Sequence, residues 1–266
     1  MTILDTIVAD TIALTRSRKT ALPASTLRTL PCYEEDRRPF AAALAATDFR
    51  IIAEIKKRSP SAGTLRSDLD VATIARGYSD AGAAAISVLT EPFHFHGEIS
   101  YLHSARTASS VPILRKDFVV DPYQVLEARA FGADAVLLIA TILSPAQIDE
   151  LVHVCAEEQL GVLLEVYSAD ELNKFDHHKV QVIGANNRDL TTFEVDTTRC
   201  VTILQELPQD IVKVAESGLR SPADIAALQH SGMHAFLVGE RFMRDAEPWS
   251  TLRNWMTELT KGVEPS

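Results

Sequence analysis

The chain has 266 residues, of which 46% are hydrophobic and 23% charged, and its formal net charge is −10. This composition suits a globular protein with a full-sized core, and the negative balance argues against nucleic acids and anionic membranes as partners. Three scattered cysteines are too few for a disulfide framework or a zinc site, so we expect reduced thiols in a cytoplasmic protein. We find no signal-peptide pattern and no apolar run of membrane-spanning length, and therefore expect no membrane association.

The first part of the chain, residues 1–47, is expected to form a helical extension. Met1–Val8 has the pattern of an amphipathic helix, two Leu-Pro steps interrupt the helices that follow, and the alanine-rich stretch from Phe40 to Ala46 is again helical. We expect this extension to pack on the mouth of a catalytic domain formed by residues 48–266. The pair Arg18-Lys19 either ends a helix in solvent or reaches over that mouth, and the sequence leaves both interpretations open.

From residue 48 onward one unit repeats: an apolar strand, a polar loop, a capped helix, a glycine and the next strand. Helix starts have an N-cap residue that precedes either proline or a capping box, and helix ends have a glycine suited to the left-handed conformation. The predicted starts are Asp121-Pro122, Ser144-Pro145, Ser221-Pro222 and the box from Ser168 to Glu171, and the predicted end glycines are Gly82, Gly132, Gly161 and Gly232.

Eight apolar runs predict eight strands, and most of them are continuous and rich in β-branched residues, as in parallel strands covered on both faces. They are Ile51–Ile55, Ala85–Leu89, Pro112–Leu114, Ala135–Ile139, Val162–Val166, Val180–Ile183, Ile211–Ala215 and Ala235–Val238. Eight such units in a chain of this length predict a single (β/α)8 TIM barrel with an N-terminal helical extension. A doubly wound open sheet would need a glycine-rich turn after its first strand, whereas this turn is basic and contains only Gly63.

Charged residues follow the ends of several predicted strands, where a TIM barrel has its active site. Glu54 and Lys56 are two apart on the first strand and share its inner face, so they form either a buried ion pair that closes the strand or part of a site. By the same alternation Lys116, Glu165, Asn186 and Glu216 point into the barrel mouth. Because charges are rarely fully buried, several of them converging at one end indicate an active site.

The residue types at these positions limit the chemistry. A lysine among carboxylates and apolar walls can act as a general acid or form a Schiff base. Ser217-Gly218 and Gly239 follow the last two strands, where barrels of this kind bind phosphate through backbone N–H groups. The residues alone therefore indicate a lyase or isomerase, without metal or cofactor, that acts on a substrate resembling a sugar phosphate.

Five motifs at these strand ends occur together and in order. They are Glu54-Ile55-Lys56-Lys57-Arg58-Ser59-Pro60-Ser61, Ser87-Val88-Leu89-Thr90-Glu91, Leu114-Arg115-Lys116-Asp117-Phe118, Gly184-Ala185-Asn186-Asn187-Arg188-Asp189-Leu190 and Ala215-Glu216-Ser217-Gly218. Together they resemble the indole-3-glycerol phosphate synthase family over nearly the whole chain. The resemblance implies a carboxy-lyase of tryptophan biosynthesis that converts 1-(2-carboxyphenylamino)-1-deoxyribulose 5-phosphate into indole-3-glycerol phosphate, carbon dioxide and water.

The resemblance also implies a role for each matching residue. Lys116 would be the general acid that protonates the ketose oxygen, Glu165 would handle protons in the later dehydration, and Glu54 with Asn186 would orient the anilino end. Lys56 would lie near the substrate carboxylate. The residues implied in substrate contact are Ser59, Phe95, Phe118, Arg188 and Glu216, and those implied at the phosphate are Ser217, Gly218, Gly239 and Glu240.

One departure from the family pattern concerns Glu240, where family members often have a small serine. Since a carboxylate pointing inward would repel a phosphate, we expect Glu240 to offer only its backbone N–H and to turn its side chain away. The cations Lys56, Lys57, Arg58, Lys116 and Arg188 are expected to gather at the mouth, where they would counter the negative net charge.

The remaining features are expected to have structural roles, and two alternative functions stay open. His94-Phe95-His96 and His177-His178 have no third ligand at a recognisable spacing, so no metal is expected, and the two tryptophans are expected to pack helices. We expect a monomer that binds a small phosphorylated molecule. Two other functions stay open at this point: a Schiff-base aldolase that uses Lys116, and a barrel without catalytic activity.

Overall fold

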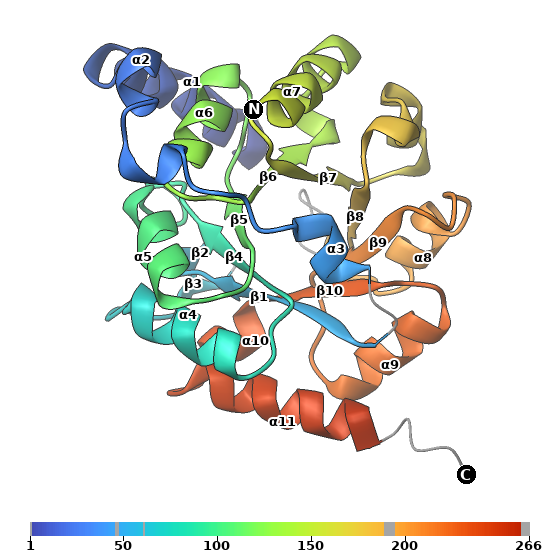
Figure 1. The fold of residues 1–266 in the computed structure, drawn as a ribbon. Coiled ribbons are helices and arrows are strands. Elements are labelled where there is room, and N and C mark those ends of the chain that lie inside the picture. The colour runs from blue at the N-terminus through green and yellow to red at the C-terminus, as the bar shows by residue number, and fades with distance from the viewer. Residues whose placement is uncertain (1, 46–47, 61, 189–194, 262–266) are drawn as a thin grey trace.

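The computed structural model describes residues 2–45, 48–60, 62–188 and 195–261. Eight parallel strands close into a barrel in the order β1-β10-β9-β8-β7-β6-β5-β4, and helices between them form the outer layer (Figure 1). The strands are β1 (Arg50–Ile55), β4 (Ala85–Leu89), β5 (Ile113–Lys116), β6 (Ala135–Ile139), β7 (Gly161–Val166), β8 (Val182–Asn186), β9 (Val212–Glu216) and β10 (Ala235–Val238). The predicted TIM barrel with an N-terminal helical extension is confirmed.

The helices alternate with these strands as expected. The extension contains α1 (Ile3–Ala21), α2 (Ala24–Leu27), the 3-10 turn η1 (Pro31–Tyr33) and α3 (Phe40–Leu44). The barrel contains α4 (Val71–Asp80), α5 (Ser100–Ala108), α6 (Pro122–Ala130), η2 (Ala140–Ile142), α7 (Pro145–Glu157), η3 (Ala169–Lys174), η4 (His177–Lys179), α8 (Arg199–Leu204), α9 (Pro222–His230), α10 (Glu240–Met243) and α11 (Pro248–Lys261). The predicted end of the third helix at Ala46 and the domain boundary at residue 47 lie outside the described residues.

Most predicted helix signals are present. Ser144 and Ser221 form complete capping boxes, and the Asp121 side chain accepts a hydrogen bond from the backbone of Tyr123. The box at Ser168 was predicted wrongly, because its side chain makes no capping bond and a 3-10 helix follows. There the Glu171 carboxylate instead accepts hydrogen bonds from the Tyr167 N–H and the Thr141 hydroxyl.

The glycine prediction holds for three of four positions. Gly82, Gly132 and Gly232 have φ angles of 92°, 92° and 88°, as expected for a left-handed helix end. Gly161 is the exception, because Gln159 takes the left-handed conformation with φ of 54° and Gly161 already belongs to β7. A Cβ at residue 161 would lie 3.2 Å from the Cβ of Phe40, so this glycine makes room for α3.

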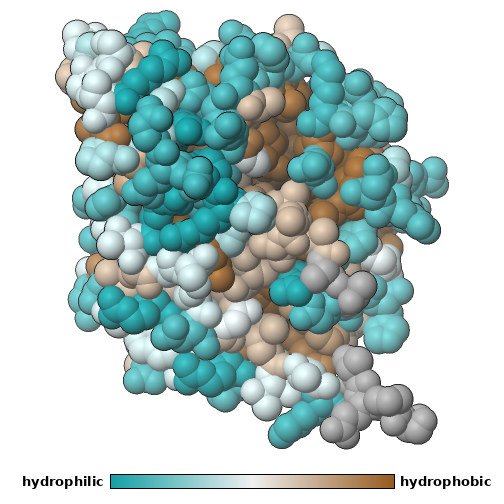
Figure 2. Space-filling view, in the orientation of Figure 1, coloured by the Kyte–Doolittle hydropathy of each residue, from teal (hydrophilic) through white to brown (hydrophobic). Residues whose placement is uncertain are grey.

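The barrel has two apolar regions, one on each side of its wall. Between the strands and the outer helices lies the larger core, and inside the barrel lies a smaller cluster that includes Ile52, Leu114, Leu163 and Val214. Helix α3 closes the amino-terminal end of the barrel, since Phe40 and Leu44 join this inner cluster. The α3 region forms a tan, mildly apolar centre on the face seen in Figure 2, with hydrophilic residues around it.

One smaller element completes the fold. A two-stranded antiparallel sheet of β2 (Arg58–Ser59) and β3 (Gly63–Thr64) shapes the loop after β1, and its strands are too short to give a sequence pattern. In the part of the chain that the structure describes, no helix combines the length and apolar character needed to cross a bilayer.

Candidate active site

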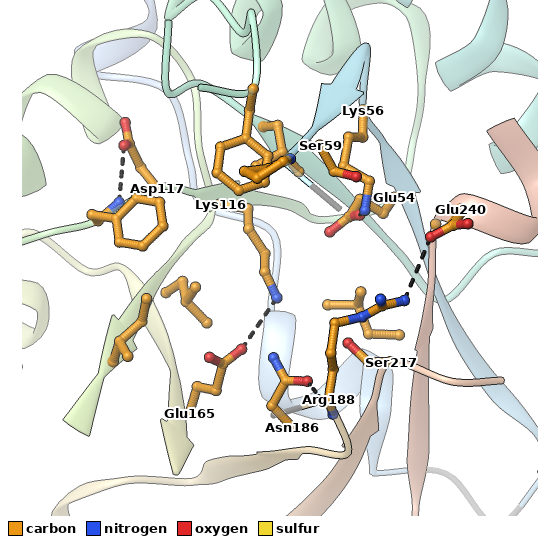
Figure 3. A pocket seen from close by; sticks show the side chains of 18 of the residues that line it. Glu54, Lys56, Ser59, Lys116, Asp117, Glu165, Asn186, Arg188, Ser217 and Glu240 are labelled. Carbon is orange, nitrogen blue, oxygen red and sulfur yellow. Dashed lines mark hydrogen bonds and ion pairs between the residues drawn. The ribbon is translucent and has the colours of Figure 1, made fainter. Parts of the chain in front are cut away.

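Four charged side chains form one layer inside the carboxyl-terminal end of the barrel. Glu54, Lys116, Glu165 and Glu216 come from β1, β5, β7 and β9, which alternate around the barrel, and alternate strands fill one layer of a TIM barrel. The Lys116 Nζ lies 2.5 Å from Glu216 Oε2. It also lies 3.4 Å from Glu165 Oε2, a contact that Figure 3 shows. One ammonium group therefore faces three carboxylates, each of which is at most 3% exposed.

The close approach of these charges determines whether Lys116 and Glu216 are protonated. Burial alone would lower the pKa of Lys116, but the charges of Glu216, Glu165 and Glu54 together outweigh burial and raise it, so the lysine is an ammonium. Burial raises the pKa of Glu216 to about 8, although the Lys116 charge opposes the shift and Glu165 adds to it. Lys116 is thus a hydrogen-bond and proton donor, and Glu216 is a carboxyl group that titrates near neutral pH.

Gly184 makes room for Glu216. A Cβ at residue 184 would overlap the Oε1 of Glu216 and lie 3.1 Å from Leu163 Cδ1. That Oε1 is buried and has no hydrogen-bond partner among the described residues. The glycine of β8 therefore allows the carboxyl group of β9 to lie beneath Lys116, a packing role that the sequence alone did not reveal.

Glu54 forms the predicted pair with its neighbour on the same face. Its Oε1 lies 2.6 Å from Lys56 Nζ, and the side chains are 4% and 15% exposed. Gly239 packs against this carboxylate, because a Cβ at residue 239 would overlap Glu54 Oε1. The φ of Gly239 is −126°, so the need for glycine at this position comes from the space that Glu54 occupies.

One wall of the pocket is apolar. Phe95 and Phe118 form a tilted pair with ring centroids 6.0 Å apart, and both line the pocket. The loop that contains Phe95 is held by Glu91, whose carboxylate accepts hydrogen bonds from the backbone N–H groups of residues 93, 94 and 95 at 2.7–2.9 Å. The apolar lining that the sequence did not predict includes Ile3, Leu4, Ile7, Leu89, Leu137, Ile139 and Leu237.

The opposite rim is suited to an anion. Ser217 and Gly218 have positive φ angles of 67° and 79°, and both residues line the pocket together with Arg188. Two successive residues in this conformation turn backbone N–H groups toward one side, which favours anion binding. Glycine is required at residue 218, because a Cβ there would overlap Val195 in addition to the strain of its φ.

Asn186 joins the charged layer to this rim. Its side-chain oxygen accepts a hydrogen bond from the Arg188 N–H at 3.0 Å, and its Nδ2 donates to the Tyr167 hydroxyl at 2.8 Å. Figure 3 shows Asn186 and Arg188 beside Lys116 and Glu165. Tyr167 lines the pocket as well, although its position one residue beyond the end of β7 gave no signal in the sequence.

The structure corrects the expectation for Glu240. Its carboxylate is not turned away from the mouth but lies at the pocket rim, 3.5 Å from Arg188 (Figure 3). It also lies 2.7 Å from Arg244. Burial would raise the pKa of Glu240, but Arg244, Arg188 and Lys56 together lower it, so this carboxylate is ionised. The Glu240 carboxylate therefore forms an ion pair with Arg188, the cation of the anion rim.

The expected gathering of cations is only partly correct. Lys56, Lys116 and Arg188 line the pocket, but Lys57 and Arg58 do not, and the Arg58 guanidinium lies 3.0 Å from His96 Nε2. Of the remaining residues assigned by resemblance, Ser59 lines the pocket and Glu216 lies below it. Among the described residues no group of three or more His, Cys, Asp or Glu side chains could hold a metal ion.

Arg18 and Lys19 do not reach over the pocket. Arg18 NH1 lies 3.1 Å from Glu127 Oε2, and Lys19 Nζ lies 2.7 Å from Asp121 Oδ2, so both fix the last turn of α1 to α6. The first turn of α1, rather than its last, contributes to the pocket through Ile3, Leu4 and Ile7. Ser61 of the first motif and Asp189-Leu190 of the fourth motif lie outside the described residues.

Taken together, fold and site define a class. A lysine among carboxylates lies at the carboxyl ends of the strands of a (β/α)8 barrel, between an aromatic wall and an anion-binding rim. This arrangement is typical of a barrel enzyme that carries out acid–base chemistry on an aromatic compound with a phosphate or carboxylate group.

Comparison with known proteins identifies the family. The family model described as indole-3-glycerol phosphate synthase matches residues 4–254. A protein of that name from Salinibacter ruber is 46% identical over 264 residues, which cover 98% of this chain and 97% of the relative. Another from Rhodopirellula baltica is 47% identical over 252 residues and covers 93% and 96% of the two chains. The chain belongs to the indole-3-glycerol phosphate synthase family.

More distant solved structures share the fold. A thiamine phosphate pyrophosphorylase from Pyrococcus furiosus superposes with a TM-score of 0.59 at 15% identity, covering 85% of this chain and all of that one. A mutant tryptophan synthase α-subunit from the same organism gives a TM-score of 0.58 at 15% identity, with 80% and 98% covered. At such identity these likenesses establish the barrel alone.

Proposed function

We propose that the chain converts 1-(2-carboxyphenylamino)-1-deoxyribulose 5-phosphate into indole-3-glycerol phosphate, carbon dioxide and water, a step of tryptophan biosynthesis. The observation that supports this most directly is the position of Lys116. Its ammonium group is held between Glu165 and Glu216 and lies between an aromatic wall and an anion rim. The substrate has an aromatic ring at one end and a phosphate at the other, with the reacting ketone between them.

The pocket suggests how the substrate lies. The anilino ring fits against Phe95 and Phe118 and the apolar side chains of α1. The phosphate fits at the rim formed by Ser217, Gly218, Gly239 and the backbone N–H of Glu240, with Arg188 beside it. Lys56 then lies near the ring carboxylate. The ketone oxygen falls in the middle, within reach of Lys116.

In the first step, the ring carbon that bears the carboxylate attacks the ketone carbon, and Lys116 donates a proton to the ketone oxygen. Loss of carbon dioxide then returns the bonding electrons to the ring and restores its aromaticity. Because neighbouring carboxylates raise the pKa of Lys116, the lysine starts each turnover protonated. General acid catalysis of this kind typically contributes about 10²- to 10⁴-fold.

In the second step, the new hydroxyl group leaves as water. Glu165, 3.4 Å from Lys116, takes up a proton from solvent and passes it to that hydroxyl. Glu54 and Asn186 orient the anilino end and assist removal of the proton that completes the indole ring. Together the steps release one carbon dioxide and one water for each substrate consumed.

A direct assay tests the proposal. Purified protein and the carboxyphenylamino-deoxyribulose phosphate, mixed in the presence of a chelator, should give indole fluorescence and one equivalent of carbon dioxide. An aldolase that forms a Schiff base on Lys116 would instead be trapped by borohydride with substrate attached. The raised pKa of Lys116 disfavours that alternative, because a Schiff base requires the neutral amine. Trapping without indole formation would overturn the proposal.

Several accompanying expectations are part of the same proposal. Residues 1–47 would act as an extension of the mouth of the catalytic domain formed by residues 48–266. The protein would work as a monomer in the cytoplasm, without a nucleic-acid partner. Size-exclusion chromatography with light scattering tests the monomer, and a mass of twice 29.2 kDa would contradict it.

A further inference from the structure

Two polar contacts fix α1 to two elements at the barrel mouth, the loop after β4 and helix α6. Near its middle, Asp10 Oδ2 lies 3.0 Å from His94 Nε2 in the loop after β4. Near its end, Arg18 NH1 lies 3.1 Å from Glu127 Oε2 on α6, which follows the loop after β5. Thr11 and Thr15 are buried on the face between these contacts. Helix α1 thus spans the loop after β4 and helix α6.

The Arg18 contact continues into the protein as a chain of alternating charges. The same oxygen of Glu127 that accepts from Arg18 lies 2.8 Å from Arg115 NH2, and that NH2 lies 2.9 Å from Asp117 Oδ2. The Arg115 side chain is fully buried, and those of Glu127 and Asp117 are 3% and 5% exposed. Removing one member of such a buried chain leaves its neighbour with an uncompensated charge, which is costly.

The chain ends at the residue directly after Lys116. Asp117 accepts hydrogen bonds from the Thr90 hydroxyl at 2.6 Å and from the backbone N–H of Phe118 at 2.9 Å. Figure 3 shows its carboxylate directed away from Lys116. Asp117 therefore does not contact the reacting groups, but it joins the ends of β4 and β5 and fixes the backbone of Phe118.

The other contact of α1 leads to the second aromatic residue. His94 belongs to the turn that Glu91 holds by three backbone hydrogen bonds, and the next residue is Phe95. The rings of Phe95 and Phe118 lie 6.0 Å apart, and the first turns of α1 line the same pocket. Both loops that contain an aromatic residue of the pocket wall are thus connected to one helix.

We propose that Arg18 and Asp10 are positioning residues, through which α1 sets the spacing between Phe95 and Phe118 and so the fit of an aromatic substrate. This inference rests on the proposed function for the identity of that substrate. It assigns no chemistry to α1: the helix acts by holding two loops in register with each other, and the anion rim across the pocket is independent of it.

The chain offers a matched control for the test. Arg18→Met removes the charge that enters the buried chain but keeps a long apolar side chain. Lys19→Met removes the neighbouring charge, whose partner Asp121 is on the same helix α6, but that pair is exposed at 45% and 31%. Exposed pairs contribute little, so Lys19→Met should behave as wild type. Arg18→Lys keeps a positive charge near Glu127, so it should behave more like the wild type than Arg18→Met does.

Three measurements on the full-length protein separate positioning from a general loss of structure. For Arg18→Met we expect a KM for the carboxyphenylamino substrate at least fivefold higher, with kcat reduced less than KM is raised. The Kd of inorganic phosphate should stay within twofold of wild type. Amide hydrogen exchange should become faster in residues 93–97 and 117–121 and stay unchanged in 217–219.

The outcomes are decisive for the inference. Arg18→Met kinetics and exchange equal to those of Lys19→Met would overturn it. So would an equal loss of phosphate and substrate affinity together with exchange that rises throughout the barrel, since this would indicate a merely structural role. If the wild type does not convert the substrate, the proposed function fails, yet the exchange comparison still decides whether α1 holds the two loops.

Discussion

At the scale of single residues, the central feature is the excess of carboxylates around Lys116. Of the three acids around it, Glu54 is also paired with Lys56, and the pKa of Glu216 is raised to about 8, so Glu216 holds a proton through much of the neutral range. The roles of the acids follow from their positions. Glu165 lines the pocket beside Lys116, whereas Glu216 lies below the lysine, over Gly184.

A first prediction concerns Glu165→Gln. The amide keeps the shape of the side chain and a hydrogen-bonding group near Lys116 but cannot transfer the proton. We expect kcat to fall by about 10²-fold or more while KM changes less than threefold, because an interaction needed only in the transition state is lost. Steady-state kinetics measure both. A raised KM with intact kcat would make Glu165 a binding residue.

A second prediction concerns Glu240, which pairs with Arg188 at the phosphate rim. Because this carboxylate competes with a ligand phosphate for Arg188, Glu240→Ser should tighten binding of inorganic phosphate. Partly exposed ion pairs contribute about 0.2–1 kcal/mol, so we expect a gain of up to about fivefold. Arg244→Met serves as the control and should weaken binding, since Glu240 then has only Arg188 left as a partner at the rim. Weaker phosphate binding by Glu240→Ser, measured calorimetrically, would contradict this account.

At the scale of elements, the sequence predicted what depends on local patterns. Continuous apolar runs identified the eight strands, and Ser-Pro and Asp-Pro steps identified the starts of α6, α7 and α9. Alternation along each strand was enough to bring Glu54, Lys116, Glu165 and Glu216 to one layer. These inferences succeed because strand periodicity and capping depend on neighbours in the chain.

What the sequence could not predict depends on contacts between distant segments. Nothing local distinguishes Gly184 and Gly239 as the glycines that make room for carboxylates of β9 and β1. Arg18 pairs with Glu127 and Glu240 pairs with Arg188, and both of these partners lie far away in sequence. The direction of the Arg18 side chain was therefore left open, and that of Glu240 was wrongly assigned. The apolar part of the pocket from α1 was missed for the same reason.

A third prediction follows for β8. In Gly184→Ala the new Cβ would displace the Glu216 side chain from its place below Lys116. We expect kcat to fall about tenfold or more, because the orientation of the general acid is lost. Gly161→Ala is the matched control in β7: its Cβ would meet apolar neighbours at 3.2–3.3 Å, so Tm should fall with kcat unchanged. Equal kcat values for the two variants would refute the packing role of Gly184.

At the scale of the whole molecule, burying the charged layer lowers the free energy of unfolding, and the packing of the rest of the barrel offsets this loss. The folded protein keeps a proton on Glu216 up to about pH 8, whereas in the unfolded chain this carboxyl group loses its proton near its ordinary pKa of 4.5. Since Glu216 keeps its proton in the folded state over this interval, its contribution to stability falls as pH rises from about 5 to about 8. Lys116 does not alter this trend, because its pKa is 10.5 in the unfolded chain and is raised in the folded protein, so it is charged in both states over this interval.

A fourth prediction uses this dependence. Glu216→Gln removes the titrating group, so its Tm minus that of wild type should increase between pH 5 and pH 9. With roughly 2–4 °C per kcal/mol for a chain of this size, the increase should reach at least about 3 °C. Differential scanning fluorimetry across the pH series measures it. A difference that is constant, or that shrinks toward pH 9, would show that Glu216 is ionised throughout.

The most direct test of the central claim, that the Lys116 ammonium performs the acid chemistry of the barrel, is a single-turnover experiment with Lys116→Met. Methionine keeps an unbranched apolar side chain, so circular dichroism and phosphate affinity should match the wild type. The rate of indole formation should fall by about 10²-fold or more, the contribution expected of a general acid. A variant that keeps more than about a tenth of the wild-type rate would show that another group donates the proton, and the assignment of Lys116 would be wrong.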